Sequence, residues 1–329
     1  MKGNKRLIEM KKFPSIEQFR NVVKVVRLQH DYQGKDELGA PIYQHLSDYP
    51  TLWFQGTVKL HGTNAGIVKY KDRIEFQSRE RILNLGSDNA GFMTTMSGYN
   101  LDFMFDGIEF NDYIAIYGEW CGSSIQKGVA ICELPKMFVV FGLLVDDEWR
   151  NCADVPVNEE YRIFNINQFP TFGVEIDFNN PEAIQNKLIE LTLAVEEECP
   201  VGKHFGKRGI GEGLVLTCNE RPELRFKSKG EKHSSSKVKV LNSVDTEQIV
   251  TIKEFVEYAV TENRLQQGLT TLKETFAEPT QKETRDFIQW IMRDILKEET
   301  DTIVANGLEF KKYSGAIATK ARQWYLNNI

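Results

Sequence analysis

Six short segments rich in aromatic and β-branched residues fill much of the sequence between positions 53 and 239, and they limit the possible folds more than any other feature. Polar or glycine-bearing residues separate them, as is usual for strands. They do not alternate regularly with helices, so a parallel α/β sheet is not expected. The pattern predicts mixed or antiparallel sheets, built from TLWFQGTVKL, RIEFQS, YIAIYGEW, FVVFGLLV, GLVLTC and LRFKS.

Helices are predicted in two places. Residues 180–198 carry apolar side chains at helical spacing, and Pro181 suits a first helical turn. Toward the C-terminus, Phe287, Ile291 and Ile295 recur every four residues, as on the buried face of a helix. The predicted fold class is therefore α+β, with mixed or antiparallel sheets and packed helices followed by a small all-α part.

The chain length predicts how many domains there are. A chain of 329 residues corresponds to about two domains. The change of pattern places one domain over residues 1–243 and an α-helical domain over residues 244–329. A chain of this size buries about 75% of its unfolded surface, so it needs no metal or disulfide to hold it together. The five cysteines are odd in number and lack CxxC spacing, so we expect reduced thiols.

The charge of the chain is unevenly distributed. The net charge of −6 argues against indiscriminate binding to nucleic acid, but residues 221–239 hold seven basic and two acidic side chains. This local excess suggests one phosphate-handling site, and a solvated loop is the alternative. Residues 1–12 lack the apolar stretch of a signal peptide, and no run approaches the roughly 18 apolar residues of a membrane span. We therefore expect a cytoplasmic protein without a membrane partner.

The segment KLHGTN places a lysine, Lys59, at the end of a predicted strand, before a Gly-Thr-Asn turn. A lysine amine attacks phosphorus only when it is neutral, and its ordinary pKa of about 10.4 leaves well under about 1% neutral at pH 7. Lys59 would therefore need nearby cations, a metal or desolvation to lower its pKa. Taken alone, the segment is weak evidence, and a surface lysine before a tight turn is then the favoured interpretation.

Two further predicted strands carry polar side chains near their ends. Arg79 follows RIEFQS, where a guanidinium can fork onto a phosphate. Glu119 lies in YIAIYGEW, where a period of two places it on the face opposite Ile114, Ile116 and Trp120. A carboxylate there can bind ribose hydroxyls or a metal-bound water. Each residue could also be an ordinary polar residue at the end of a strand.

The last two motifs combine a carboxylate with lysines. Glu212 precedes GLVLTC, and together with Glu119 it offers the oxygen ligands that Mg²⁺ prefers. In LRFKSK, strand alternation puts Lys227 and Lys229 on one face. These lysines could hold a triphosphate, stabilise charge that develops at the α-phosphate, and depress the pKa of Lys59. The alternative is a solvated edge strand, where lysines discourage aggregation.

Each of these features can be explained by itself as an ordinary surface or strand-end residue. Their occurrence together and in this order has no such explanation. The order KLHGTN, SRER, YGEW, FVVFGLLV, EGLVL and FKSK, over residues 59–229, resembles the covalent nucleotidyltransferase superfamily of ligases and capping enzymes. It is most similar to the phage RNA ligase 2 family, which includes the trypanosome RNA-editing ligases. His61 stands where DNA ligases and capping enzymes usually carry Asp, which favours RNA ligases. The helical C-terminal part is similar to that family only in class.

The resemblance implies roles in nucleotide binding for five of the residues. Lys59 would be the nucleophile that forms a lysyl-AMP intermediate. Asn64 and Arg79 would contact the nucleotide or the end phosphate. Glu119 would bind the ribose, and Phe141 would stack on adenine.

The resemblance also implies roles in phosphate and metal handling. Glu212 would act on metal or phosphate, with Glu119 as a second candidate metal ligand. Lys227 and Lys229 would contact phosphates and take part in catalysis. No role follows for His61, which could be a turn histidine bonded to the backbone.

The activity that the resemblance implies is ATP-dependent RNA ligation with Mg²⁺. Lys59 would take AMP from ATP and expel pyrophosphate, AMP would pass to an RNA 5′-phosphate, and a 3′-hydroxyl would then displace AMP. Nicks in duplex RNA are the expected substrate, with single-stranded ends left open, and the protein is expected to be a monomer. A phage origin, and hence the host cytoplasm, suits the resemblance. The alternatives are a capping-type guanylyltransferase that uses GTP and a catalytically inactive RNA-end-binding module.

Overall fold

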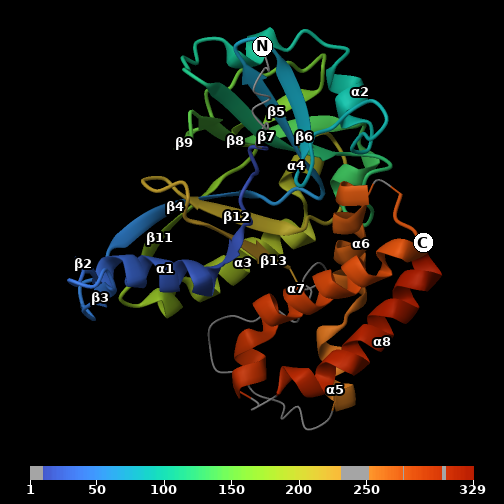
Figure 1. Ribbon diagram of the computed structural model, residues 1–329. Helices are drawn as coiled ribbons and strands as arrows, with labels where there is room; N and C mark the ends of the chain where they lie inside the picture. The colour runs from blue at the N-terminus through green and yellow to red at the C-terminus, as the bar shows by residue number, and fades with distance from the viewer. Residues whose placement is uncertain (1–9, 231–251, 277, 306–308) are drawn as a thin grey trace, which may run out of the picture.

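The computed structural model describes residues 10–230, 252–276, 278–305 and 309–329. These residues form two large sheets, one above the other in Figure 1, and a group of helices that contains the C-terminus. The predicted α+β class, with sheets first and helices last, is confirmed. The predicted domain boundary between residues 243 and 244 lies outside the described residues, as do the last three lysines of the basic segment, Lys232, Lys237 and Lys239.

The first sheet has the strand order β10-β8-β7-β5-β6, and β9 pairs with β8. Its pairings are antiparallel except for β10 and β8, which run parallel. The strands are β5 (Gly62–Tyr70), β6 (Ile74–Ser78), β7 (Tyr113–Cys121), β8 (Met137–Val145), β9 (Glu148–Arg150) and β10 (Ile163–Asn165).

The second sheet has the order β1-β13-β12-β4-β11. Only the short pairing of β1 with β13 is parallel, so both sheets are of the mixed or antiparallel kind that the sequence predicts. The strands are β1 (Glu17–Gln18), β4 (Thr51–Val58), β11 (Phe172–Asp177), β12 (Gly213–Cys218) and β13 (Arg225–Lys229).

Strand β7 shows how the sequence builds the first sheet. Ile114, Ile116 and Trp120 pack into one apolar cluster, and Tyr117 packs into another on the opposite face. The alternation predicted for this segment is therefore confirmed. Strand β7 pairs with β8 on one side and β5 on the other, and apolar clusters cover both of its faces. It therefore holds Glu119 in a rigid setting.

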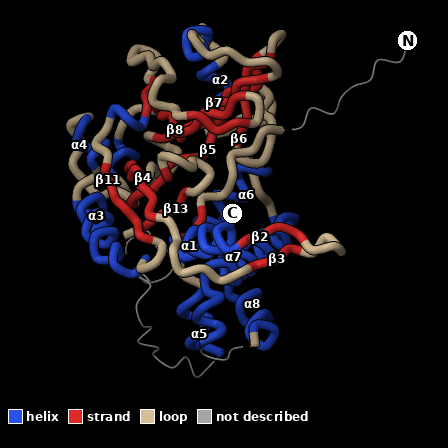
Figure 2. Tube along the Cα trace, turned by 90° about the vertical axis from the view of Figure 1, so that its left-hand side faces the viewer, coloured by secondary structure: helices blue, strands red, loops and turns tan. Residues whose placement is uncertain are grey.

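Helices cover the second sheet. Helices α1 (Phe19–Asp31) and α3 (Gln185–Glu197) pack against it, and α3 confirms the helix predicted over residues 180–198. A hairpin of β2 (Tyr32–Lys35) and β3 (Pro41–Tyr43) projects from the body of the molecule in Figures 1 and 2. The remaining helices of this part are α2 (Phe92–Met96), α4 (Pro200–His204) and the 3₁₀ helices η1 (Asp102–Phe105), η2 (Ala130–Glu133), η3 (Ile166–Gln168) and η4 (Pro181–Ile184).

The C-terminal helices have an apolar core of their own. Phe287, Ile291 and Ile295 are fully buried in it, as their spacing predicts. The elements are α5 (Ile252–Ala259), α6 (Glu262–Phe276), η5 (Gln281–Glu283), α7 (Thr284–Ala305) and α8 (Phe310–Asn328). Within the described residues, no helix is both long and apolar enough to span a membrane.

Candidate active site

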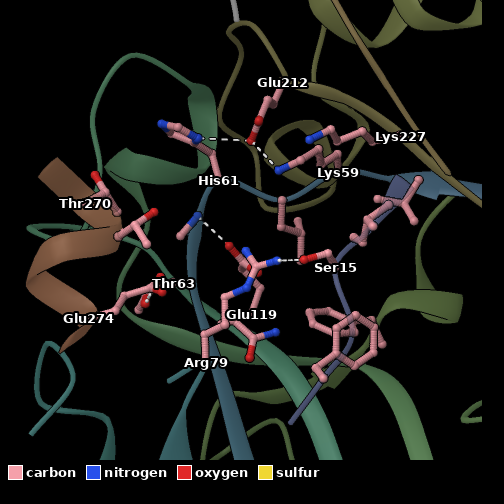
Figure 3. Close-up of a pocket in the computed structure, with 18 of the residues that line it drawn as sticks. Ser15, Lys59, His61, Thr63, Arg79, Glu119, Glu212, Lys227, Thr270 and Glu274 are labelled. Carbon is pink, nitrogen blue, oxygen red and sulfur yellow. Dashed lines mark hydrogen bonds and ion pairs between the residues drawn. The ribbon is translucent and has the colours of Figure 1, made fainter. Parts of the chain in front are cut away.

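A cavity of about 1980 Å³ opens between the two sheets and the C-terminal helices. Every residue that the sequence singled out as a candidate site residue lines it, although these residues come from six separate segments (Figure 3). They are Lys59, Asn64, Arg79, Glu119, Phe141, Glu212, Lys227 and Lys229, with His61 among them. The fold therefore brings the predicted residues into one place.

The KLHGTN segment is the crossover from the second sheet to the first. Lys59 directly follows β4, and its backbone N–H donates to the carbonyl oxygen of Gly213 at 2.8 Å. Gly62 begins β5 so close to β7 that an added Cβ would lie 2.3 Å from the carbonyl oxygen of Trp120. The glycine is required by this close approach, which fixes Lys59 at the junction of the two sheets.

Glu212 lies at the centre of the site. One of its carboxylate oxygens lies 2.9 Å from the Lys59 Nζ and 3.0 Å from the His61 Nδ1, and the other lies 2.9 Å from the Lys229 Nζ. Burial alone would raise the pKa of Glu212, but the two ammonium groups and His61 hold it well below its ordinary value. Glu212 is thus a buried, ionised partner for two lysines.

The pKa of Lys59 corrects one expectation from the sequence. Neighbouring cations and desolvation were expected to lower it, and burial and Arg79 do act in that direction. The carboxylates of Glu212 and Glu119 outweigh them, so the pKa is raised above 10.5. The expectation was wrong because it considered the positive charges of the neighbouring lysines but not the negative charge of Glu212, whose carboxylate lies between Lys59 and Lys229. Lys59 is therefore an ammonium ion until its pairing with Glu212 is broken or offset.

Glu119 and Glu212 differ in how well they suit a divalent cation. Glu119 accepts a hydrogen bond from the Gly62 N–H at 2.9 Å, and burial raises its pKa to about 7, although Lys59 opposes this. Both oxygens of Glu212 already pair with cationic groups. Among the described residues no group of three or more His, Cys, Asp or Glu side chains is arranged to hold a metal. Glu119 is the better fit, since a bound cation would favour its ionised form, and both metal roles stay predictions.

The other predicted nucleotide contacts line the same cavity. Arg79 donates to the Ser15 hydroxyl at 3.3 Å, and the backbone carbonyl of Asn64 accepts from Asn89 at 3.1 Å. Phe141 is partly buried, and its ring meets that of Phe13 edge-on with centroids 5.0 Å apart. Part of the Phe141 ring is thus already packed against Phe13, and its proposed stacking on adenine stays a prediction.

Strand β13 presents its basic residues to the cavity. Lys227 and Lys229 both line it, while Phe226, which precedes them, is buried in the core, and Ser228 between them bonds to Thr192 of α3. Their partners differ, because Lys229 pairs with Glu212 whereas the Lys227 Nζ lies 3.5 Å from a carboxylate oxygen of Glu298. The predicted alternation is confirmed, and the roles of the two lysines remain untested.

The C-terminal helices contribute residues that the sequence analysis missed. Glu274 of α6 is 8% exposed and accepts a hydrogen bond from the Thr63 hydroxyl at 3.1 Å. Burial raises the pKa of Glu274 to about 7. Thr270 of the same helix lies 3.4 Å from Gln126, and Glu298 of α7 reaches Lys227. The sequence carries no signal for these contacts, because polar residues on the outer face of an amphipathic helix do not show which partner they meet.

Comparison with known proteins places the chain in a family. A family model described as RNA ligase matches residues 53–299, which is well over half of the chain. No curated protein matches the sequence. Among solved structures, a Naegleria gruberi RNA ligase with pyrophosphate is similar at 18% identity and a TM-score of 0.43, and a mutant of that ligase with AMP and Mn at 15% and 0.44. Each match covers 68% of this chain and 56% of the Naegleria chain, so the chain spans little more than half the length of these relatives. On the evidence of the family match, the chain belongs to the RNA ligase family.

Proposed function

We propose that the protein is an ATP-dependent RNA ligase that joins a 3′-hydroxyl to a 5′-phosphate through lysyl-AMP at Lys59. The observation that carries this proposal is the junction of the two sheets, where Lys59 meets Glu212 and Lys229 at the wall of a large cavity. A lysine nucleophile beside further cations suits attack on a phosphate, because the negative charge on the phosphoryl oxygens is stabilised where it develops.

The first step follows from this arrangement. Lys59 first loses a proton to solvent, and its neutral nitrogen then attacks the α-phosphorus of ATP. A P–N bond forms, the bond from the α-phosphorus to the oxygen that bridges it to the β-phosphate breaks, and pyrophosphate leaves. Lys227 and Lys229 face the cavity and can bind the phosphate oxygens during the transfer. A magnesium ion held at Glu119 would neutralise phosphate charge and help to release Lys59 from its pairing with Glu212.

The later steps pass the AMP to RNA. The 5′-phosphate of one RNA end attacks the lysyl-AMP and frees Lys59, and the 3′-hydroxyl of the other end then attacks that phosphate and releases AMP. We expect nicked duplex RNA as the substrate. Arg79 lies beside the cavity, where its guanidinium can hold a phosphate during these steps.

One assay separates this function from the two alternatives. The protein is incubated with α-labelled ATP or α-labelled GTP and Mg²⁺ in the absence of RNA. Covalent label from ATP supports the ligase, label from GTP would indicate a capping-type guanylyltransferase, and no label would indicate an RNA-end-binding module. Sealing assays on matched nicked and single-stranded RNAs then identify the preferred substrate.

A further inference from the structure

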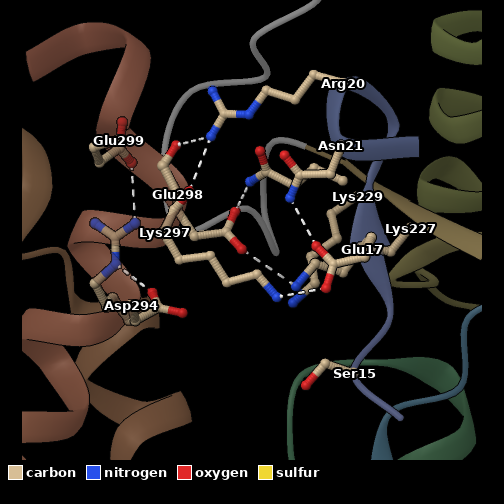
Figure 4. Close-up of polar contacts among 12 residues, drawn as sticks. Ser15, Glu17, Arg20, Asn21, Lys227, Lys229, Asp294, Lys297, Glu298 and Glu299 are labelled. Atoms are coloured by element: carbon tan, nitrogen blue, oxygen red, sulfur yellow. Dashed lines mark hydrogen bonds and ion pairs between the residues drawn. The ribbon is translucent and has the colours of Figure 1, made fainter. Parts of the chain in front are cut away.

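Helix α7 reaches the strand that carries the predicted phosphate-binding lysines (Figure 4). One carboxylate oxygen of Glu298 lies 3.5 Å from the Nζ of Lys227, and the other accepts a hydrogen bond from the Gln18 side chain. The side chains of Glu298 and Lys227 are only 10% and 26% exposed. The ion pair is therefore partly shielded from water and better held than a surface pair.

Further contacts fasten α7 at this place. The Arg20 guanidinium donates to the backbone carbonyls of Lys297 and Glu298, at 3.1 and 2.8 Å. The Lys297 Nζ lies 3.1 Å from a carboxylate oxygen of Glu17. Glu17 belongs to β1, which pairs with β13 next to Lys227. The helix thus contacts both the strand that bears Lys227 and the strand beside it.

Carboxylates already pair with the three lysines that the sequence predicts to handle phosphate. Glu212 pairs with Lys59 and Lys229, and Glu298 pairs with Lys227. A phosphate that binds to these lysines has to compete with the carboxylates for them. Glu212 is fixed by the strand pairing beside it, whereas Glu298 belongs to helices with a core of their own. Glu298 can therefore leave with its helices while the sheet stays intact.

A second contact of the same helices, at Glu274 of α6, includes a buried oxygen atom that lacks a hydrogen bond to any described residue. The Oε2 oxygen of Glu274 is buried and has no hydrogen-bond partner within the described part of the chain. Arg79 lies close enough to favour the ionised form of this carboxylate. A phosphate that binds to Arg79 would weaken the electrostatic stabilisation that Arg79 gives to the Glu274 carboxylate. The phosphate would also repel Glu274, because both carry negative charge. An anion in the cavity thus weakens the docked position of the helices at two points.

We propose that the Glu298–Lys227 pair is a latch that holds the C-terminal helices over the cavity and that phosphate groups displace. The proposal rests on the proposed function, because it takes Lys227 as a phosphate site. A phosphate on Lys227 displaces Glu298 and removes one of the contacts that hold α7 beside β13, so the helices move away from the strand more readily than in the phosphate-free protein. By linkage, any change that weakens the latch strengthens phosphate binding by the same factor.

The first test measures phosphate binding without catalysis. Calorimetry gives the affinity of the full-length protein and of its Glu298→Gln variant for sodium tripolyphosphate. The substitution keeps the shape and the bond to Gln18 but removes the charge, so we expect about fivefold tighter binding. The control is Glu309→Gln, which removes an exposed carboxylate that pairs with Lys312 on α8 and should leave the affinity unchanged. Equal or weaker binding by the Glu298→Gln variant would overturn the latch.

The second test measures the movement itself. Small-angle X-ray scattering of the wild-type protein should show a larger radius of gyration in saturating tripolyphosphate than in buffer. A 5′-phosphorylated RNA and its 5′-hydroxyl counterpart then distinguish the nucleotide from the RNA end as the source of the displacing phosphate. Scattering that stays unchanged in tripolyphosphate and in both RNAs would contradict the proposal.

The latch and the proposed function fail in different ways. A protein that binds tripolyphosphate as expected but forms no covalent adduct with ATP would refute the ligase activity and keep the latch. A working ligase whose Glu298→Gln variant binds tripolyphosphate like the wild type would refute the latch alone.

Discussion

The Lys59 ammonium and the Glu212 carboxylate lie 2.9 Å apart, next to the ends of two paired strands. The register that pairs Leu214 of β12 with Val58 of β4 sets this distance, so it depends on the sheet and not on a flexible loop. The same carboxylate also holds Lys229. This shared carboxylate therefore joins the two lysines and His61 into one partly buried cluster.

Glu212→Gln should destabilise the protein, because it leaves two ammonium groups without their buried partner. We expect the free energy of unfolding at pH 7 to fall by about 3 kcal/mol in urea titrations. The folded-state pKa of Glu212 is depressed, so its stabilisation is present above 4.5 and is lost as the pH falls through the folded-state value. The difference between variant and wild type should therefore shrink in acid. The control Glu190→Gln, on the exposed face of α3, should change little at any pH.

Glu119→Gln should have the opposite dependence on pH. The pKa of Glu119 is about 7, above its ordinary 4.5, so its folded-state contribution is favourable in acid and is lost as the pH rises through 7. The variant should match the wild type at pH 5 and be more stable at pH 8, where it avoids burying a charge. Its binding of ATP with Mg²⁺ should be weaker at both pH values. Equal stability at pH 8, measured beside the exposed control Glu133→Gln, would argue against a buried, protonated Glu119.

Lys227→Ala and Lys229→Ala should each slow lysyl-AMP formation by about 100-fold, because each removes a cation that faces the transferred phosphate. Rapid-quench measurements with labelled ATP give the rate, and circular dichroism checks that the variants are folded. Lys187→Ala, which removes an exposed lysine of α3, is the control. Rates equal to that of the control would return β13 to the solvated-edge interpretation.

Lys59→Ala should lose all adenylylation but still seal RNA that already carries a 5′-adenylate, because that step bypasses the bond between lysine and AMP. The measurement compares the two activities on one preparation. Covalent labelling that persists in this variant would show that another residue is the nucleophile.

The chain truncated to residues 1–243 should fold and still accept AMP from ATP, because every predicted motif lies within it and the C-terminal helices have a separate core. The truncation also deletes Glu298, the ion-pair partner of Lys227, and we expect this loss not to slow the transfer of AMP from ATP. Sealing of 5′-phosphate ends should fall much more, since it requires a grip on two RNA ends. A folded truncated protein that lacks both activities would show instead that the helices orient the pyrophosphate leaving group.

Local patterns were enough to predict strands β4, β6, β7, β8, β12 and β13, but not β5, which begins at Gly62 where a Gly-Thr-Asn turn is expected from the sequence. Of the residues at the cavity, Asn64 and Phe141 were implied by the family resemblance and not by a local pattern. The alternation in β7 separates Ile114 from Tyr117, and the helical spacing of Phe287 places it in a core. The first pattern distinguishes the two buried faces of β7, and the second marks the buried face of a helix. Burial is what apolar periodicity encodes.

Contacts between distant segments could not be predicted in the same way. Phe13 and Ser15 enter the site from the N-terminal segment, and Glu274 and Glu298 from helices far along the chain. Their neighbours in sequence show no periodicity that points to a partner. The raised pKa of Lys59 belongs to the same class, because it depends on which carboxylate the tertiary fold places beside the lysine.

The proposed ligase activity requires Lys59 to be the residue that receives AMP. Mass spectrometry of proteolytic peptides, after incubation of the wild-type protein with ATP and Mg²⁺, tests it directly. We expect a single adenylylated peptide, with AMP on Lys59. AMP on Lys227 or Lys229, or no adduct in a folded protein that binds ATP, would contradict it.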